Sequence, residues 1–168
     1  VTLALAYSGS FSWELVPGYC LAQLAGAFTG AIVVWFHYYL HWKVTHNPAE
    51  KLAVFCTGPA IRSNVHNLIS EIIGTAVLIL GLLTIGANKF TEGLNPLVVG
   101  LLIVSIGVSL GGTTGFAVNP ARDLGPRLAH FILPIAGKGS SDWAYAWVPV
   151  VGPVIGGVMG AWLYQLLF

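Results

Sequence analysis

Long apolar stretches dominate this sequence and limit what it can fold into. A helix needs about 20 predominantly apolar residues to cross the hydrocarbon core of a bilayer. Stretches of that length lie at residues 16–40, 67–87, 94–112 and 144–168. Composition agrees, because 56% of the residues are hydrophobic and only 8% are charged, against about 25% charged in soluble domains. The sequence therefore predicts an all-α protein that crosses a membrane several times.

The charged residues and cysteines exclude several other classes of protein. The seven Lys and Arg residues are scattered and the net charge is +1, so we expect no nucleic-acid partner. Cys20 and Cys56 have no C-x-x-C or Cys/His spacing around them, which argues against a metal site or a disulfide framework. The chain opens with VTLALA, without an initiator Met or a signal peptide, and is expected to be a fragment.

Two apolar segments are too short to cross a bilayer: the opening VTLALA and the run from Asn119 to about His130. Short helices at membrane depth are tolerated where they are buried in protein or line a water-filled cavity. Transporters built from inverted repeats carry such interrupted helices in matching places. These segments therefore predict a channel or transporter with re-entrant half-helices.

A weak internal repeat supports this prediction. When QLAGAFTGA (residues 23–31) is laid over PVIGGVMGA (153–161), Gly26 meets Gly156 and Gly30 meets Gly160. Each copy holds a G-x-x-x-G, which lets helix backbones approach closely. Each also follows a short apolar segment, so an inverted repeat explains the match better than chance does.

The tripeptide Asn-Pro-Ala occurs twice, at residues 47–49 and 119–121. Asn is a strong N-cap and Pro suits the first helical position, so a helix of two or three turns is expected after Asn119, despite Gly125-Pro126. The charges between residues 43 and 62 are too dense for membrane depth. We therefore interpret Asn47 as the cap of a short surface helix that Gly58-Pro59 stops, and residues 119–121 as the functional copy.

The stretch FAVNPARDLGPR, residues 116–127, resembles the second signature of the aquaporin superfamily, in its glycerol-facilitator branch. In that family the first signature is Asn-Pro-Ala followed by Val-Thr, and this chain begins Val1-Thr2. The resemblance implies that the first tripeptide lies immediately before residue 1. Val150 departs mildly from the branch. The residues that suit the branch, besides Asn-Pro-Ala-Arg-Asp, are Tyr38, Gly107, Phe116, Arg127 and Pro149.

The resemblance implies one aquaporin-like domain over residues 1–168, an inverted-repeat helical bundle whose first two spans are missing. It comprises the end of the first half-helix, the third to sixth spans and the second half-helix. It also implies a passive multi-pass channel of the cell membrane for glycerol, other small neutral solutes and some water, without cofactor or metal. Four copies would form a homotetramer in the lipid bilayer.

Three residues form the selectivity filter that the resemblance implies. Arg122 offers five fixed donors and stays charged, which suits two neighbouring hydroxyls and repels cations. A buried arginine at membrane depth is a functional candidate in its own right, and a purely structural membrane scaffold would leave it unexplained. Phe116 would be an apolar wall, and Gly107, lacking a side chain, would keep the constriction wide; packing by the Gly107-x-x-x-Gly111 pair is the structural alternative.

Other residues would line or support the path. Asn119 would cap the half-helix and turn its NH2 toward the solute, while Pro120 and Ala121 shape the turn. The backbone carbonyls that would accept from hydroxyls belong to Phe116, Ala117 and Val118.

Three charged residues are expected to have supporting roles. Asp123 is expected to pair with a nearby donor and hold a loop. The resemblance implies that Glu71 accepts from N–H groups of a re-entrant loop; a proton relay is the alternative. Arg127 is expected to be a surface charge of the half-helix.

Two alternatives stay open. A water-selective aquaporin is one. The other is an intramembrane serine hydrolase, because Gly107-Val-Ser109-Leu-Gly111 fits G-x-S-x-G and His130 is a plausible downstream base. That motif requires a strand-to-helix turn, whereas here it lies late in a helical span, so we do not expect an enzyme.

Overall fold

The computed structural model describes residues 1–90 and 93–168, and within those ranges it contains helices and no strand. Among the described residues, four helices are long and apolar enough to cross a membrane: α2, α5, α6 and α8. The span of α2 includes the 3-10 turn η1 before it, and the span of α6 includes the 3-10 turn η2 after it. This confirms the predicted all-α, multi-pass fold. The elements are α1 (Thr2–Tyr7), η1 (Trp13–Leu15), α2 (Val16–His37), α3 (His41–Val44), α4 (Pro48–Phe55), α5 (Asn64–Gly86), α6 (Leu94–Leu110), η2 (Gly111–Thr113), α7 (Pro120–Ile132) and α8 (Val148–Leu167).

Three of the predicted span boundaries were wrong by three or four residues. The second span begins at Asn64 rather than at residue 67. The first span ends at His37 rather than at residue 40, because the chain turns back and the Trp42 indole N–H donates to the Trp35 carbonyl (2.9 Å). That bond supplies a partner for a last-turn carbonyl. The last span begins at Val148 rather than at residue 144, and Pro149 occupies the first turn, where it costs no hydrogen bond.

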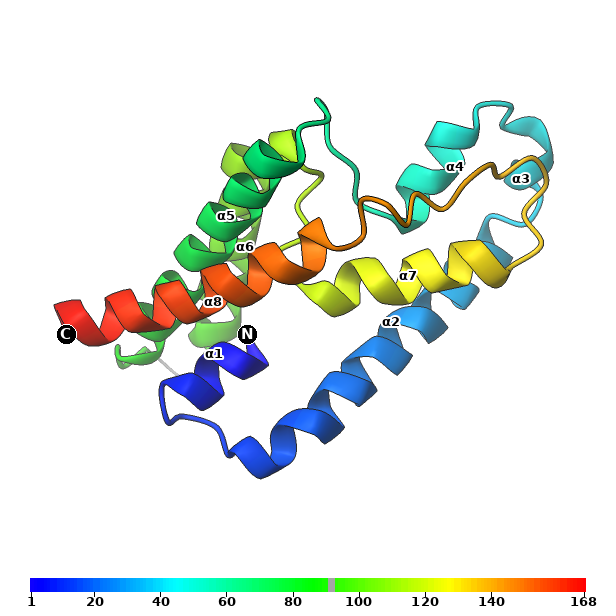
Figure 1. Ribbon diagram of the computed structural model, residues 1–168. Helices are drawn as coiled ribbons and strands as arrows, with labels where there is room; N and C mark the ends of the chain where they lie inside the picture. The colour runs from blue at the N-terminus through cyan, green and yellow to red at the C-terminus, as the bar shows by residue number, and fades with distance from the viewer. Residues whose placement is uncertain (91–92) are drawn as a thin grey trace.

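The closest helix pair is α5 against α8 (Figure 1). A Cβ on Gly156 would lie 2.3 Å from the Ile72 carbonyl oxygen, and one on Gly160 would lie 2.5 Å from the Ala76 carbonyl oxygen. The missing side chains therefore let the backbones touch, as G-x-x-x-G predicts. Gly26 and Gly30 meet no described atom within 4 Å, so that copy makes no such contact here.

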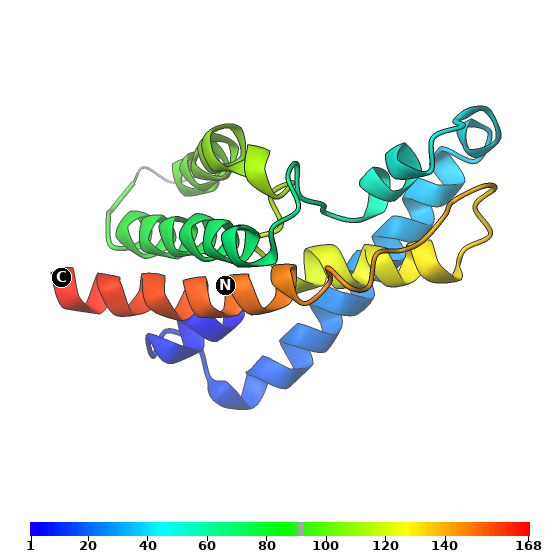
Figure 2. The same ribbon diagram turned by 45° about the horizontal axis from the view of Figure 1, so that its top comes forward.

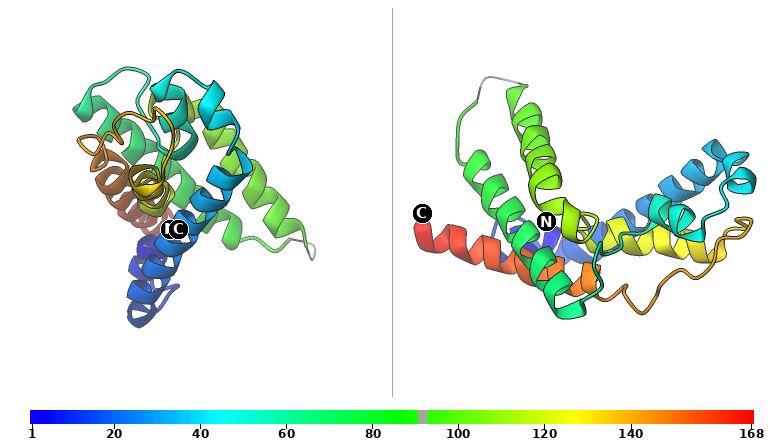
Figure 3. Two further views of the ribbon diagram at one scale, coloured as in Figure 1. Left: turned by 90° about the vertical axis from the view of Figure 1, so that its right-hand side faces the viewer. Right: turned by 90° about the horizontal axis from the view of Figure 1, so that it is seen from above.

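Helix α6 lies beside α5 and forms a hairpin with it, which Figure 3 shows from above. Leu102 of α6 fills the space over Gly81, where a Cβ would come within 2.8 Å of its Cδ2. The outer faces of α2 and α6 carry many exposed large hydrophobic side chains, among them Leu21, Val33, Leu101, Val104 and Val108. Such faces suit lipid or other membrane helices rather than water.

The two half-helices are held in a crossed arrangement. Helix α1 packs on α8, and α7 packs on α2. Figures 1 and 2 show that α1 and α7 begin near the middle of the molecule and run away from each other. Each half-helix thus rests on a span from the other half of the chain, which is the arrangement expected of an inverted repeat.

Helix α7 has 13 residues, more than the two or three turns predicted, because Gly125-Pro126 does not interrupt it. At about 1.5 Å per residue it is about 20 Å long, too short for a hydrocarbon core of about 30 Å. Gly125 sets its position, since a Cβ there would lie 2.7 Å from Ala27 Cβ and 2.9 Å from Phe28 N of α2.

Candidate functional site

The N-termini of α1 and α7 line one cavity of about 220 Å³. Val1 and Thr2 lie on one side, and the Asn119-Pro120-Ala121 turn lies on another, with side chains of α2 and α8 completing the wall. A helix N-terminus carries unsatisfied N–H groups and the positive end of the helix dipole. The cavity is therefore lined mainly by apolar groups, with donors at two helix ends.

The two Asn-Pro-Ala copies are used differently. Asn119 Oδ1 accepts from the Ala121 N–H (2.9 Å), and among the described residues its NH2 group has no acceptor. Asn47 Oδ1 likewise accepts from the Ala49 N–H (3.0 Å), but its NH2 donates to Glu50 Oε1 (3.2 Å). Asn47 is exposed at the start of α4, so its prediction as a surface N-cap is confirmed. Asn119 alone keeps free donors.

The loop before α7 has an unusual backbone. Phe116 and Val118 have φ angles of 59° and 43°, in the left-handed region that bulky and β-branched residues rarely occupy. Glu71, which is 2% exposed, accepts from Thr114 Oγ1 (2.6 Å), Ala117 N (3.1 Å) and Val118 N (2.8 Å). A buried carboxylate of α5 thus stabilises a strained conformation, and such strain is concentrated at functional sites.

The same hydrogen bonds leave the carbonyl side of the loop free. Within residues 1–90 and 93–168, no hydrogen bond reaches the carbonyl oxygens of Phe116, Ala117 or Val118. Buried or half-buried carbonyls are nearly always paired, with protein or with water. Three consecutive unpaired acceptors therefore indicate a surface that a hydroxylated solute or water can use.

Gly107 and Gly111 make room for the Phe116 ring. A Cβ on Gly107 would lie 3.3 Å from Phe116 Cε1, and one on Gly111 would lie 3.1 Å from Phe116 Cβ. In the described chain the atoms nearest to both glycines thus belong to Phe116 rather than to another helix. The two glycines of α6 and η2 instead position one aromatic side chain.

Arg122 is not buried in this chain. Its side chain is exposed and lines a cavity of about 370 Å³ between α2, α4 and α7. It makes no hydrogen bond or ion pair among the described residues. The expectation that Arg122 is buried was wrong for the described chain, because the first turn of α7 directs this side chain away from the core. No described contact joins Arg122 to Phe116 or Gly107.

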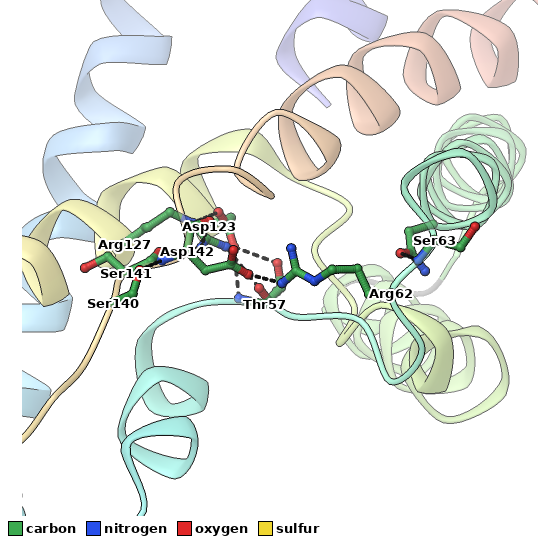
Figure 4. Close-up of polar contacts among 9 residues, drawn as sticks. Thr57, Arg62, Ser63, Asp123, Arg127, Ser140, Ser141 and Asp142 are labelled. Carbon is green, nitrogen blue, oxygen red and sulfur yellow. Dashed lines mark hydrogen bonds and ion pairs between the residues drawn. The ribbon is translucent and has the colours of Figure 1, made fainter.

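The buried arginine is Arg127, one turn further along α7 (Figure 4). It is 0% exposed, as is Asp123, and its Nε and Nη2 donate to the two oxygens of that carboxylate at 2.7 and 2.8 Å. The prediction of a surface charge at Arg127 was wrong, because i and i+4 side chains lie on the same helix face and this face is covered by two connecting segments.

Those two connecting segments are joined at this ion pair. Thr57 donates to Asp123 Oδ1 from its N–H (2.9 Å) and its hydroxyl (2.6 Å), and accepts from Arg127 at its carbonyl (3.0 Å). Arg127 also donates to the carbonyls of Ser141 (2.7 Å) and Asp142 (3.0 Å). Sequence reasoning missed Thr57 and Ser141, and no local signal marks them, since Thr57 lies 66 residues from its partner.

The end of α7 is also held by polar contacts. Lys138 Nζ donates to the carbonyls of His130, Phe131 and Leu133 at 2.7 to 2.8 Å, which satisfies last-turn acceptors. His130 Nδ1 lies 2.8 Å from Ser141 Oγ, and no hydrogen-bond partner is present for its Nε2 in the described chain. Burial, with Lys138 and Arg127 nearby, lowers the pKa of His130 to about 4, so the imidazole is neutral near pH 7.

The geometry does not support a hydrolase. Ser109 lies inside α6 and its hydroxyl donates to the Ser105 carbonyl (2.7 Å), while His130 contacts Ser141 instead. A nucleophile elbow requires a strand-to-helix turn, and the described residues form no strand. No group of three or more His, Cys, Asp or Glu residues in the described ranges is arranged to hold a metal ion.

Four spans, two oppositely directed half-helices that line one cavity and a carbonyl-bearing loop define a membrane channel of the aquaporin type. The chain belongs to the major intrinsic protein family, whose pattern it matches over residues 1–164.

Similar proteins point to the glycerol branch of that family. The chain is 62% identical over 168 residues to a probable glycerol uptake facilitator protein of Thermotoga maritima, covering 100% of this chain and 72% of that protein. It is also 62% identical over 168 residues to the glycerol uptake facilitator protein of Bacillus subtilis, covering 100% of this chain and 61% of that protein. The X-ray structure of the aquaglyceroporin from Plasmodium falciparum matches with a TM-score of 0.82 and 32% identity, over 98% of this chain and 69% of the other.

Proposed function

We propose that this chain forms part of a passive transmembrane channel for glycerol and other small neutral solutes, with some water passing as well. The observation that carries the proposal is the loop at residues 114–119: among the described residues, three consecutive carbonyls and the NH2 of Asn119 have no hydrogen-bond partner. A polyol needs both acceptors and donors along its route. The membrane fold and the relatives named as glycerol uptake facilitators support the same substrate.

The path along the loop would exchange hydrogen bonds stepwise. A permeating hydroxyl donates in turn to the carbonyls of Phe116, Ala117 and Val118, and then accepts from the NH2 of Asn119. Pro120 and Ala121 shape the turn that presents this amide. Because Glu71 accepts from the N–H groups of residues 117 and 118, it would keep the carbonyl sides available for solute.

The selectivity filter we propose combines Arg122, Phe116 and Gly107. The Phe116 ring lies against Gly107, which supports an apolar wall at this point. Arg122 faces a cavity with its guanidinium unpaired among the described residues, so its donors are free for two hydroxyls. Its fixed charge would repel cations and protons.

The same proposal extends to a supporting residue, to the chemistry of the site and to the assembly. Asp123 supports the site by fixing α7 to the segment around Thr57. The family and the relatives named as glycerol uptake facilitators support transport, so we propose no catalytic, cofactor or metal chemistry. We further propose a single channel domain over residues 1–168 that works within a homotetramer.

Stopped-flow light scattering tests this function. The intact gene product is reconstituted into liposomes, and vesicle reswelling is followed under an inward glycerol gradient and, separately, shrinking is followed under an impermeant solute. Rapid reswelling above that of empty liposomes is expected. Fast water flux without glycerol reswelling would favour a water-selective aquaporin instead, and labelling of Ser109 by a serine-reactive probe would favour the hydrolase.

A further inference from the structure

Residues 56–63, which we call the strap, connect α4 to α5 and run beside Asp123 and Arg127 of α7 (Figure 4). At one end Thr57 is bound to Asp123 and Arg127 of the half-helix. In its middle the Ala60 N–H donates to the Thr113 carbonyl (3.1 Å). The strap therefore contacts both α7 and the beginning of the carbonyl-bearing loop.

The contact between strap and loop is a backbone contact. Gly115 has a φ of 80°, and a Cβ there would lie 3.2 Å from the Gly58 carbonyl oxygen and 3.3 Å from Gly58 N. No side chain stands between the two segments at this point. Because Gly115 directly precedes Phe116, a shift of the strap is transmitted to the aromatic wall and to the first free carbonyl.

The far end of the strap is held by Arg62. Its Nη2 is paired with Asp142 Oδ2, and its guanidinium carbon lies 5.2 Å from the centroid of the Tyr145 ring. The Tyr145 side chain is buried, at 1% exposure. Asp142 also accepts at its carbonyl from Arg127 (3.0 Å), so it joins the surface cation Arg62 to the buried cation Arg127.

The anchors of the strap differ in their exposure to solvent. Thr57 and Asp123 are 4% and 0% exposed, whereas the side chains of Arg62 and Asp142 are 52% and 22% exposed. Exposed ion pairs are weaker than buried ones and compete with water and salt. The Arg62 contact is therefore the anchor of the strap that opens at the lowest cost.

We propose that Arg62 is a positioning residue that sets solute selectivity: by holding the strap onto Asp142 and Tyr145, it keeps the strap pressed against the loop that carries Phe116 and the free carbonyls. The inference rests on the proposed glycerol channel. Glycerol must fit the aromatic wall and the carbonyls together, whereas water is small and needs only hydrogen bonds. Loosening the strap therefore reduces glycerol flux more than water flux.

The strap does not detach when this contact is lost, because Asn67 also binds its far end. Asn67 of α5 accepts from the Ser63 N–H (2.9 Å) and donates to the Ile61 carbonyl (3.1 Å). Loss of the Arg62 contact is thus expected to change the fit of the loop without unfolding it. We expect the glycerol-to-water permeability ratio to fall by about two- to fivefold, the range that loss of an exposed ion pair alone supports.

The test is a double-mutant cycle on the intact gene product in liposomes. The variants are Arg62→Gln, Asp142→Asn and both together, with Arg62→Lys as the conservative replacement. Asn is chosen at position 142 because the backbone there has a φ of 50°, which Asn tolerates well. Lys43→Gln is the matched control, since it removes an exposed cation near neither the strap nor the site.

Three results are expected. Each single variant lowers the glycerol-to-water ratio, the double variant lowers it no further than Arg62→Gln does, and Arg62→Lys restores part of it. Lys43→Gln leaves the ratio at the wild-type value. A structural role alone would lower the amount of inserted protein, and both fluxes with it, at a constant ratio.

The outcomes separate this inference from the proposed function. If the wild-type protein moves glycerol but Arg62→Gln and Asp142→Asn keep the wild-type ratio, the positioning role is refuted and the channel stands. If Arg62→Gln does not insert, Asp142→Asn tests the same contact from the other side. A wild-type protein that moves no glycerol would overturn the proposed function, and this inference with it.

Discussion

At the scale of single residues, identical sequence does not produce identical chemistry. Asn47 and Asn119 both cap a helix that starts with Pro-Ala, and both accept from the N–H two residues on. The difference lies in the NH2 group of the amide. At Asn47 it donates to Glu50, whereas at Asn119 it has no acceptor among the described residues. The neighbours of an asparagine therefore decide whether it can serve a solute.

This contrast leads to a prediction for the intact gene product. Asn119→Ala is expected to lose both the N-cap, worth about 0.5–2 kcal/mol, and the donor that faces the solute, so glycerol flux falls strongly. Asn47→Ala loses only a surface cap and keeps nearly wild-type flux. Both variants are compared by glycerol reswelling per inserted protein, and equal losses would mean that the wrong copy has been assigned to the path.

Gly107 allows a second test at this scale. A side chain there meets the Phe116 ring, since even a Cβ comes within 3.3 Å of it. Gly107→His is expected to slow glycerol flux at least about fivefold, equivalent to about 1 kcal/mol in its barrier, because the added imidazole narrows the path or displaces the Phe116 ring. Water flux should fall much less. A glycerol-to-water ratio that stays at its wild-type value in folded, inserted protein would show that the filter lies elsewhere.

The arginines show where prediction from the sequence failed. The sequence identified a half-helix after Asn119 and an arginine of interest in it, but assigned burial to Arg122 and exposure to Arg127. These residues are five positions apart, which separates them by about 140° around a helix at 3.6 residues per turn. Only the packing of α7 determines which face is covered, and that packing depends on segments distant in sequence.

At the scale of elements, α7 has its polar face buried. Asp123, Arg127 and His130 lie at i, i+4 and i+7 and are all 0% exposed. A pattern read for hydrophobicity would place this face in solvent. It is covered because the residues around Thr57 and Ser141 supply the matching donors and acceptors. The spans, by contrast, were predictable, because apolar length alone requires a membrane helix.

The packing of α7 against α2 can be tested at Gly125. Gly125→Ala places a methyl group 2.7 Å from Ala27 Cβ and 2.9 Å from Phe28 N, and backbone atoms cannot move aside cheaply. We expect about 1–3 kcal/mol of destabilisation, seen as a lower thermal unfolding temperature in detergent. Gly86→Ala is the matched control, because no described atom lies within 4 Å of a Cβ at that position; similar unfolding temperatures for the two variants would contradict this packing.

The last turn of α7 predicts a dependence of stability on pH. The pKa of His130 is lowered to about 4 from 6.5, so the unfolded chain binds a proton more readily than the folded chain does. The stabilising contribution is fully present above about pH 6.5 and is lost as the pH falls toward 4. Unfolding temperatures between pH 7 and 4.5 should therefore fall less steeply in His130→Gln than in wild type. Parallel slopes for the two proteins would refute a neutral buried imidazole.

At the scale of the whole molecule, the two halves depend on each other. Each half-helix rests on a span of the other half, α1 on α8 and α7 on α2. The networks of Glu71 and Asp123 then bind segments that are 43 to 70 residues apart. The channel geometry is therefore a property of the assembled halves, which explains why the sequence could predict its parts but not the contacts that join them.

The whole-molecule view leads to a prediction about residues 1–168 on their own. The relatives are longer than this chain, which spans 61% to 72% of the two glycerol uptake facilitators described above. In the described chain Arg122 is exposed, so lipid would reach its charged side chain at a cost of several kcal/mol. We expect that these 168 residues alone insert poorly and form no closed path for glycerol. Reswelling assays on liposomes that hold equal amounts of the 168-residue chain and of the intact gene product would test this, with Asn119→Leu as the control for specific flux. Glycerol flux through the 168-residue chain that Asn119→Leu abolishes would show that the wall closes without further segments.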